Sequence, residues 1–141
     1  MFNFQIKTYR EGLTPSKPHF FILSRGLNTG KPLDELCPNC FLVETDSEES
    51  RNFHYWLCYA LWQTDHFKPH LIGSVIPFIH ISTLRNCLEV AKSKALKDRA
   101  AYIKSLALLQ DFEKKAKILK QQVELFSQVK KAIFFKILYA E

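Results

Sequence analysis

The longest hydrophobic pattern of the chain lies near its C-terminus, where apolar side chains recur at alternating intervals of three and four residues. The positions of this seam are Leu109, Phe112, Ala116, Leu119, Val123, Phe126, Lys130, Ile133 and Ile137. Lys130 is its one charged member. The spacing is the a/d repeat of a coiled coil, in which each helix buries its seam against a partner helix. We therefore expect a homodimer or a partner protein bound through this helix.

Nothing in residues 92–141 interrupts a helix, because the segment contains neither glycine nor proline. Lys97 and Asp98 form only a weak break before the long helix. A preceding helix is predicted from a cap at Ser82 or Thr83 through about Lys94. Together these patterns predict a long C-terminal helix over residues 98–141, joined to the rest by a connecting helix over residues 82–97.

The first part of the chain shows the two-residue period of strands instead. Residues 2–8 alternate between apolar and polar side chains, as in a half-buried strand. Residues 19–24 are continuously apolar between His19 and Ser24 and predict a second, more buried strand. A third strand is predicted over residues 39–45. Residues 74–81 also suggest a strand, which Pro77 would confine to a sheet edge or a bulge.

One helix is predicted within this part, after the acidic residues 46–49. Asp46 as N-cap with Glu49 three residues later is the pattern of a capping box, and the helix should run to about Gln63. The expected fold class is therefore α+β. A small mixed or antiparallel sheet with packed helices forms a head over residues 1–81, and the long helix follows.

Charge separates the same two parts. The chain has a formal net charge of +6, and residues 92–141 hold 12 basic and 5 acidic side chains, which leaves −1 for residues 1–91. A basic helix first suggests nucleic acid. However, its lysines spread over several sides of the helix outside the seam, which favours solubility and partner selection. With no apolar run of membrane-spanning length and no signal peptide pattern, we expect a cytoplasmic protein without membrane contact.

Two glycines give the loop at residues 25–31 the close backbone approach that phosphate binding requires. Together with the loop before Gly73, it predicts a nucleic-acid-binding surface. Its candidate side chains are Arg25, Asn28, Thr29, Lys31, Lys68 and His70. An ordinary loop between strands explains the same residues equally well, and whether the two loops meet is open at this point. The loop lacks the Gly-Lys-Ser/Thr ending of a P-loop, so nucleotide hydrolysis is not indicated.

The cysteines offer a metal-binding alternative. Cys37 and Cys40 form a Cys-x-x-Cys turn, and His54 and Cys58 stand one helical turn apart. These four residues could hold structural zinc, but buried free thiols and a Pro-Asn turn explain them more simply, so we expect no cofactor and no metal. The histidines are scattered along the chain, and the sequence contains no motif that pairs a nucleophile with a base. We therefore expect a protein that is not an enzyme.

Four segments together resemble one half of the DNA-specificity subunit of type I restriction-modification systems. They are a strand with a glycine-containing loop, an aromatic helix, a stretch that closes the recognition domain, and the end of a spacer helix, at residues 21–31, 52–61, 71–79 and 129–138. The resemblance implies a target-recognition domain followed by a pairing helix. The sequence is also similar to a small uncharacterised bacterial family with no assigned activity.

The sequence thus predicts a non-enzymatic, DNA-binding or DNA-recognition-like module that pairs through its C-terminal helix. Two alternatives stay open. One is a protein–protein interaction module with no nucleic-acid role, and the other is a small zinc-stabilised structural domain.

Overall fold

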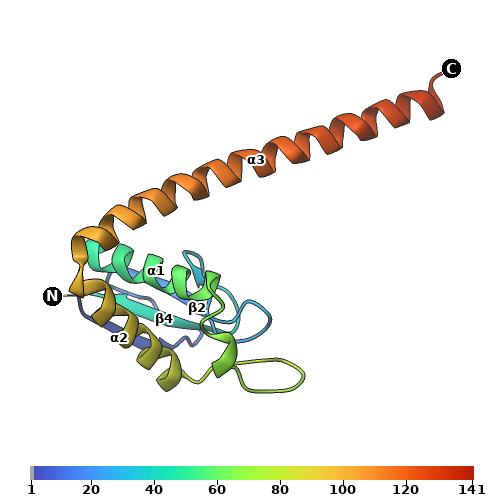
Figure 1. Ribbon diagram of the computed structural model, residues 1–141. Helices are drawn as coiled ribbons and strands as arrows, with labels where there is room; N and C mark the ends of the chain where they lie inside the picture. Colours follow the sequence, from blue (N-terminus) through green and yellow to red (C-terminus); the bar gives the residue numbers. More distant parts are fainter. Residues whose placement is uncertain (1) are drawn as a thin grey trace. The chain divides into compact units, whose positions relative to one another are not determined.

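The computed structural model describes residues 2–141, which divide into two compact units between Lys97 and Asp98. The first unit contains a four-stranded sheet with two α-helices, and the second is a single long helix (Figure 1). The α+β fold class predicted from the sequence is confirmed. The predicted connecting helix belongs to the first unit, where Leu84 and Leu88 are fully buried.

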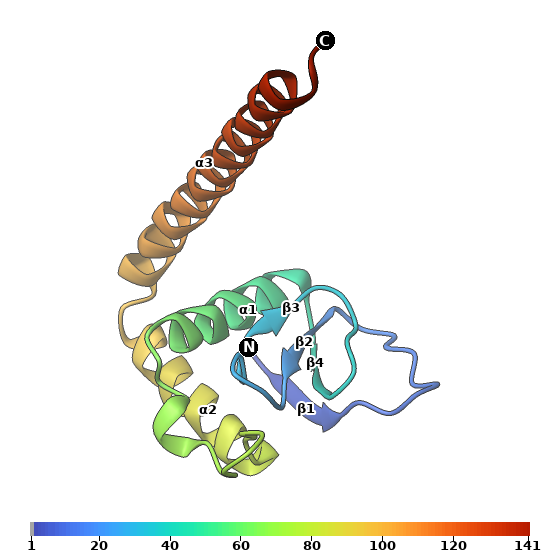
Figure 2. The same cartoon turned by 90° about the vertical axis from the view of Figure 1, so that its right-hand side faces the viewer.

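The sheet is antiparallel throughout, with strand order β1-β4-β2-β3 (Figure 2). Its strands are β1 (Phe4–Thr8), β2 (His19–Leu23), β3 (Pro32–Leu33) and β4 (Cys40–Thr45). The three longer strands fall within the segments predicted as strands, residues 2–8, 19–24 and 39–45. The two-residue β3 is too short to leave a pattern in the sequence.

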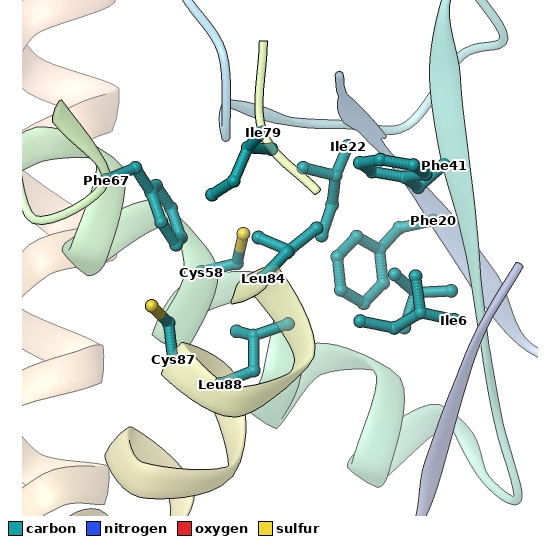
Figure 3. Close-up of a cluster of buried hydrophobic side chains, with 11 residues drawn as sticks. Ile6, Phe20, Ile22, Phe41, Cys58, Phe67, Ile79, Leu84, Cys87 and Leu88 are labelled. Carbon is teal, nitrogen blue, oxygen red and sulfur yellow. The ribbon is translucent and has the colours of Figure 1, made fainter. Parts of the chain in front are cut away.

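The main core lies between one face of this sheet and the helices α1 (Glu48–Gln63) and α2 (Ile81–Lys97). Strand residues at alternate positions supply the sheet side, and helix residues close it from the other side (Figure 3). The strand residues of this cluster are Ile6, Phe20, Ile22, Phe41 and Val43. The opposite face of the sheet carries a smaller cluster of Phe21, Cys40 and Leu42.

Helix α1 begins one residue later than the capping-box pattern predicts. Ser47 is the N-cap, in extended conformation, and its hydroxyl accepts a hydrogen bond from the backbone N–H of Ser50 at 3.1 Å. The predicted cap Asp46 instead lies 3.9 Å from the Lys17 ammonium group. A serine and an aspartate side by side compete for the cap, and the short hydroxyl side chain of Ser47 takes it. The helix ends at Gln63, as predicted.

The strand predicted over residues 74–81 is wrong. Phe78 forms isolated bridges with Ile72 and Arg25, but no ladder extends from them. Pro77 has no N–H to donate, and the side chains of Val75 and Ile76 are 90% and 61% exposed, so this segment is a loop. Helix α2 correspondingly starts at Ile81, earlier than the predicted caps Ser82 and Thr83, and ends at Lys97, beyond the predicted Lys94.

The second unit is α3 (Arg99–Tyr139), a helix of 41 residues. The predicted break at Lys97 and Asp98 is confirmed, because Asp98 is the N-cap and its carboxylate accepts the N–H of Ala101 at 3.0 Å. No residue of α3 is buried. Among residues 2–141, no helix combines the length and apolar character needed to span a membrane.

Candidate functional site

The two loops proposed to bind nucleic acid meet in the structure. Asn28 and Thr29, from the loop after β2, and Lys68, from the turn after α1, line one pocket of about 160 Å³. Trp62, at the end of α1, lines the pocket as well, together with Leu27, Gln63, Asp65, Phe67 and Leu71. The fold thus brings together two loops that are about forty residues apart in the sequence. Whether these loops meet was open from the sequence alone.

Gly30 makes this meeting possible. Its φ is +94°, and a Cβ at this position would overlap the ring of Phe67. Phe67 is 2% exposed and belongs to the main core, so its ring cannot move aside easily. Only glycine allows the loop after β2 to pass this close to the turn after α1.

Several predicted donors are already occupied within the protein. Thr29 is 3% exposed, and its hydroxyl donates to the carbonyl of Gly26. The Lys31 ammonium group lies over the Trp62 ring, 5.2 Å from its centroid. Lys68 pairs with Asp65 at 3.0 Å. Thr29 therefore shapes the loop, whereas the amines of the half-buried Lys31 and the exposed Lys68 could exchange these partners only at some cost.

Arg25 and Asn28 are the better-placed donors. Both side chains are exposed, and within residues 2–141 neither takes part in a hydrogen bond or an ion pair. The backbone of Arg25 is held by its bridge to Phe78. Both side chains therefore project from an ordered loop and are available to a ligand.

His70 does not join this pocket. It ends the short 3-10 helix η1 (Lys68–His70), and its ring centroid lies 6.0 Å from that of His66. The ligand atoms of His66, His70 and Cys87 all lie within 4.8 Å of one another. Of the six predicted residues, the pocket therefore holds Asn28, Thr29 and Lys68. Arg25 and Lys31 are outside its lining, and His70 belongs to a separate cluster.

The four residues of the zinc alternative do not converge. Cys40 lies with Leu42 on one face of the sheet, whereas Cys58 lies in the main core on the opposite face. The Cys58 thiol donates to the carbonyl of Gly30 at 3.3 Å, and burial raises the pKa of this thiol. Because alternate residues of a strand point to opposite faces, the Cys-x-x-Cys turn cannot deliver Cys40 to α1.

His54 is a core residue rather than a ligand. Its Nδ1 lies 2.8 Å from the carbonyl oxygen of Ser50, so Nδ1–H donates to that oxygen. The ring packs between Phe4 and Phe53, with centroids 4.7 and 5.2 Å away. Burial lowers the pKa of His54 to about 4, which keeps the ring neutral at physiological pH.

The sequence reasoning missed the cluster of His66, His70 and Cys87. The spacing His-x-x-x-His could have identified its two histidines, because this spacing places two imidazoles on neighbouring turns. Cys87 follows 17 residues after His70 on a different element, and only the folded chain brings its sulfur to them. Because folding brings Cys87 to the two histidines, no sequence motif contains all three ligands.

Comparison with protein-family models gives a match over residues 6–136, to a family described as being of unknown function. No curated protein and no solved structure matches the chain. The match covers the sheet, both helices of the first unit and nearly all of α3. A function for this chain must therefore be inferred from its fold and from its candidate sites.

Proposed function

The chain belongs to that family, DUF6943, and because its description carries no activity, we propose from the structure that the protein is a non-enzymatic pairing module. In this proposal, the α3 helices of two copies form an antiparallel coiled coil. The observation that carries it is a helix of 41 residues whose apolar seam is exposed along its length.

The exposed seam is too large for an unpaired helix. Phe112, Val123 and Phe126 are 59%, 68% and 71% exposed, and the other large apolar members of the seam from Leu119 to Ile137 are more than half exposed. Burying one such side chain stabilises an assembly by about 1.5–3 kcal/mol. Helices gain most of their stability from packing an apolar face, so α3 requires a partner surface of matching length.

The seam is complementary to itself when one helix is reversed. In an antiparallel pair centred on Gln121, each a position of one helix lies beside a d position of the other. The short Ala116 then faces the large Phe126, and Lys130 faces Phe112. A lysine over an aromatic face is favourable by about 0.5–1 kcal/mol at an exposed site.

A parallel pair in register is less favourable. It places the two Lys130 side chains opposite each other in the seam, and it brings Lys115 of one helix to Lys120 of the other at flanking positions. Both contacts join like charges. The antiparallel pair keeps a single contact of this kind, between the two Lys120 side chains at its exposed edge, where solvent screens it. Charge and size together favour a second copy, antiparallel, as the occupant of the seam.

The test is the mass of the full chain in solution. We expect a dimer by sedimentation or light scattering, and we expect Phe126→Asp to shift it towards monomer because it buries a charge in the seam. Gln121→Asp is the matched control, since it adds the same charge on the outer face and should leave the dimer intact. A monomeric wild-type chain at ~100 μM would exclude the proposal, because an interface of this size should be stable at that concentration.

A second candidate function, nucleic-acid binding by the head, has one observation in its favour. The two loops meet, and the side chains of Arg25 and Asn28 project from the loop after β2 without partners in the described structure. Binding of a labelled duplex should then weaken steeply with salt and weaken further in Arg25→Ala. Lys117→Ala on α3 is the control. Absence of binding at ~50 mM salt would exclude this function without affecting the pairing proposal.

A further inference from the structure

Three potential metal ligands from two separate segments converge at the edge of the main core, where His66 and His70 are exposed and Cys87 is buried. His66 and His70 flank the start and end of the turn after α1, and Cys87 stands on α2. Their ligand atoms, one imidazole nitrogen from each histidine and the sulfur of Cys87, lie within 4.8 Å of one another. None of these three residues lines the candidate pocket or belongs to the α3 seam.

The backbone holds the two histidines in place. The N–H of His66 donates to the carbonyl of Leu61 at 3.0 Å, and that of His70 donates to the carbonyl of Phe67 at 2.9 Å. Pro69 lies within η1 and restricts the backbone further. The positions of the two imidazoles are therefore set by a short, hydrogen-bonded turn rather than by a free loop.

Phe67 orients this turn. Its ring is 2% exposed and packs in the main core, while His66 and His70 on either side of it are exposed. Figure 3 shows Phe67 and Cys87 at the same end of the core cluster. A turn anchored by Phe67 thus holds both histidines at the surface beside the sulfur of Cys87.

We propose that His66, His70 and Cys87 bind a zinc ion, with a fourth position open to water. Two imidazoles and a thiolate are a donor set that zinc prefers, and the absence of carboxylates among the three disfavours calcium and magnesium. The Cys87 proton passes to water when the thiolate forms, because only the thiolate is a strong ligand. This site is distinct from the four-residue set of Cys37, Cys40, His54 and Cys58, which the fold separates.

The geometry needs only small changes for a tetrahedral site. Zinc bonds of about 2.0–2.3 Å place neighbouring ligand atoms roughly 3.3–3.8 Å apart. Atoms now up to 4.8 Å apart must approach by about 1 Å, which rotation of two exposed imidazoles can supply. Bound zinc would tie the turn after α1 to the middle of α2 and so stabilise the head.

The experiment is a zinc titration of the full chain, purified free of metal, against a chromophoric chelator. We expect one zinc ion per chain, and we expect His66→Ala and His70→Ala each to weaken binding at least about 100-fold, since even supporting residues contribute 10–100-fold. His80→Ala and Cys37→Ser remove a histidine and a thiol outside the cluster and should bind as the wild type does. Both histidines of the cluster are exposed, so their variants should fold, which circular dichroism checks.

Cobalt provides a second measurement that reports the sulfur directly. A cobalt-loaded chain should show a thiolate charge-transfer band that Cys87→Ser removes and Cys37→Ser retains. Zinc should also raise the melting temperature of the wild type and leave that of His70→Ala unchanged. Fewer than about 0.2 zinc ions per chain at saturation, or equal affinity in His70→Ala and His80→Ala, overturns the proposal.

Discussion

The ring of Phe67 occupies the space that a side chain at Gly30 would need. This contact joins the loop after β2 to the turn after α1, and it therefore supports two features at once. The contact borders the pocket, which is lined by Asn28 from the loop and Lys68 from the turn. The turn side carries His66 and His70, beside Cys87.

Replacing Gly30 should therefore destabilise the first unit strongly. Gly30→Ala places a Cβ against a buried ring at a φ of +94°, and we expect a loss of about 2–5 kcal/mol in the free energy of unfolding, as the sum of backbone strain and overpacking. Gly26→Ala is the matched control, because Gly26 has the same φ and no atom within 4 Å of the added Cβ. It should cost only the backbone strain, about 1–2 kcal/mol. Equal losses in urea unfolding would contradict the role of Phe67.

His54 should make the stability of the fold depend on pH. Its pKa is about 4 in the folded chain, against about 6.5 in the unfolded chain. Below pH ~6.5 the unfolded chain therefore binds a proton that the folded chain does not. The contribution of His54 is complete above that pH, and it falls by about 2–3 kcal/mol as the pH approaches 4.

The measurement is urea unfolding of the wild type and of His54→Phe between pH 7 and 4. The variant keeps an aromatic ring between Phe4 and Phe53, and it should show a flatter dependence on pH than the wild type. His80→Phe changes an exposed histidine and should keep the wild-type slope.

How far the sequence predicts this fold depends on whether a feature is local. The alternation of residues 2–8 and the apolar run of residues 19–24 depend only on neighbouring side chains, and the break at Asp98 depends on its own cap. These predictions are confirmed. The apolar run of residues 74–81 does not form a strand, because Pro77 has no N–H to donate and Phe78 makes only isolated bridges, to Arg25 and Ile72.

The candidate sites were less predictable because they are not local. The meeting of Asn28 with Lys68 depends on Phe67 fitting against Gly30, which no periodicity encodes. The spacing of Cys37 and Cys40 suggested zinc, but the strand that begins at Cys40 turns its sulfur away from α1. Metal-ligand spacing shows which side chains can approach one another within a turn, but it does not show whether the fold brings a second set of ligands to them.

Arg51 links α1 to β2 and to the segment after β3, and its loss should be measurable. Its Nε donates to the carbonyl of His19 at 3.1 Å, its guanidinium pairs with Asp34, and it lies over the Tyr55 ring at 5.0 Å. We expect Arg51→Lys to lower the free energy of unfolding by about 1–2 kcal/mol, because lysine keeps the charge but cannot make these contacts together. Lys17→Ala removes an exposed, 3.9 Å ion pair with Asp46 and should change stability by less than ~0.5 kcal/mol. A similar effect of both substitutions would contradict this account of Arg51.

The orientation of the α3 pair can be measured with spin labels. In a chain whose half-exposed Cys37 is replaced by serine, a label at Lys131 reports on its symmetry mate, while the buried thiols stay unlabelled. An antiparallel pair centred on Gln121 sets the two labelled positions 20 residues apart along the axis, or about 30 Å. A parallel pair in register sets the two labelled positions at the same height along the axis, so that only the backbone distance across the pair separates them, about 10–15 Å.

A label at Gln121 is the control for this measurement, because the centre of the pair brings these positions close in either orientation. We therefore expect a short distance at Gln121 and a long one at Lys131 in pulsed electron resonance. Short distances at both positions mean a parallel pair, which would place Lys130 against its own copy and remove the complementarity between Ala116 and Phe126. A monomer would give no dipolar signal at either position, and the exposed seam of α3 would then have to be covered by a different protein.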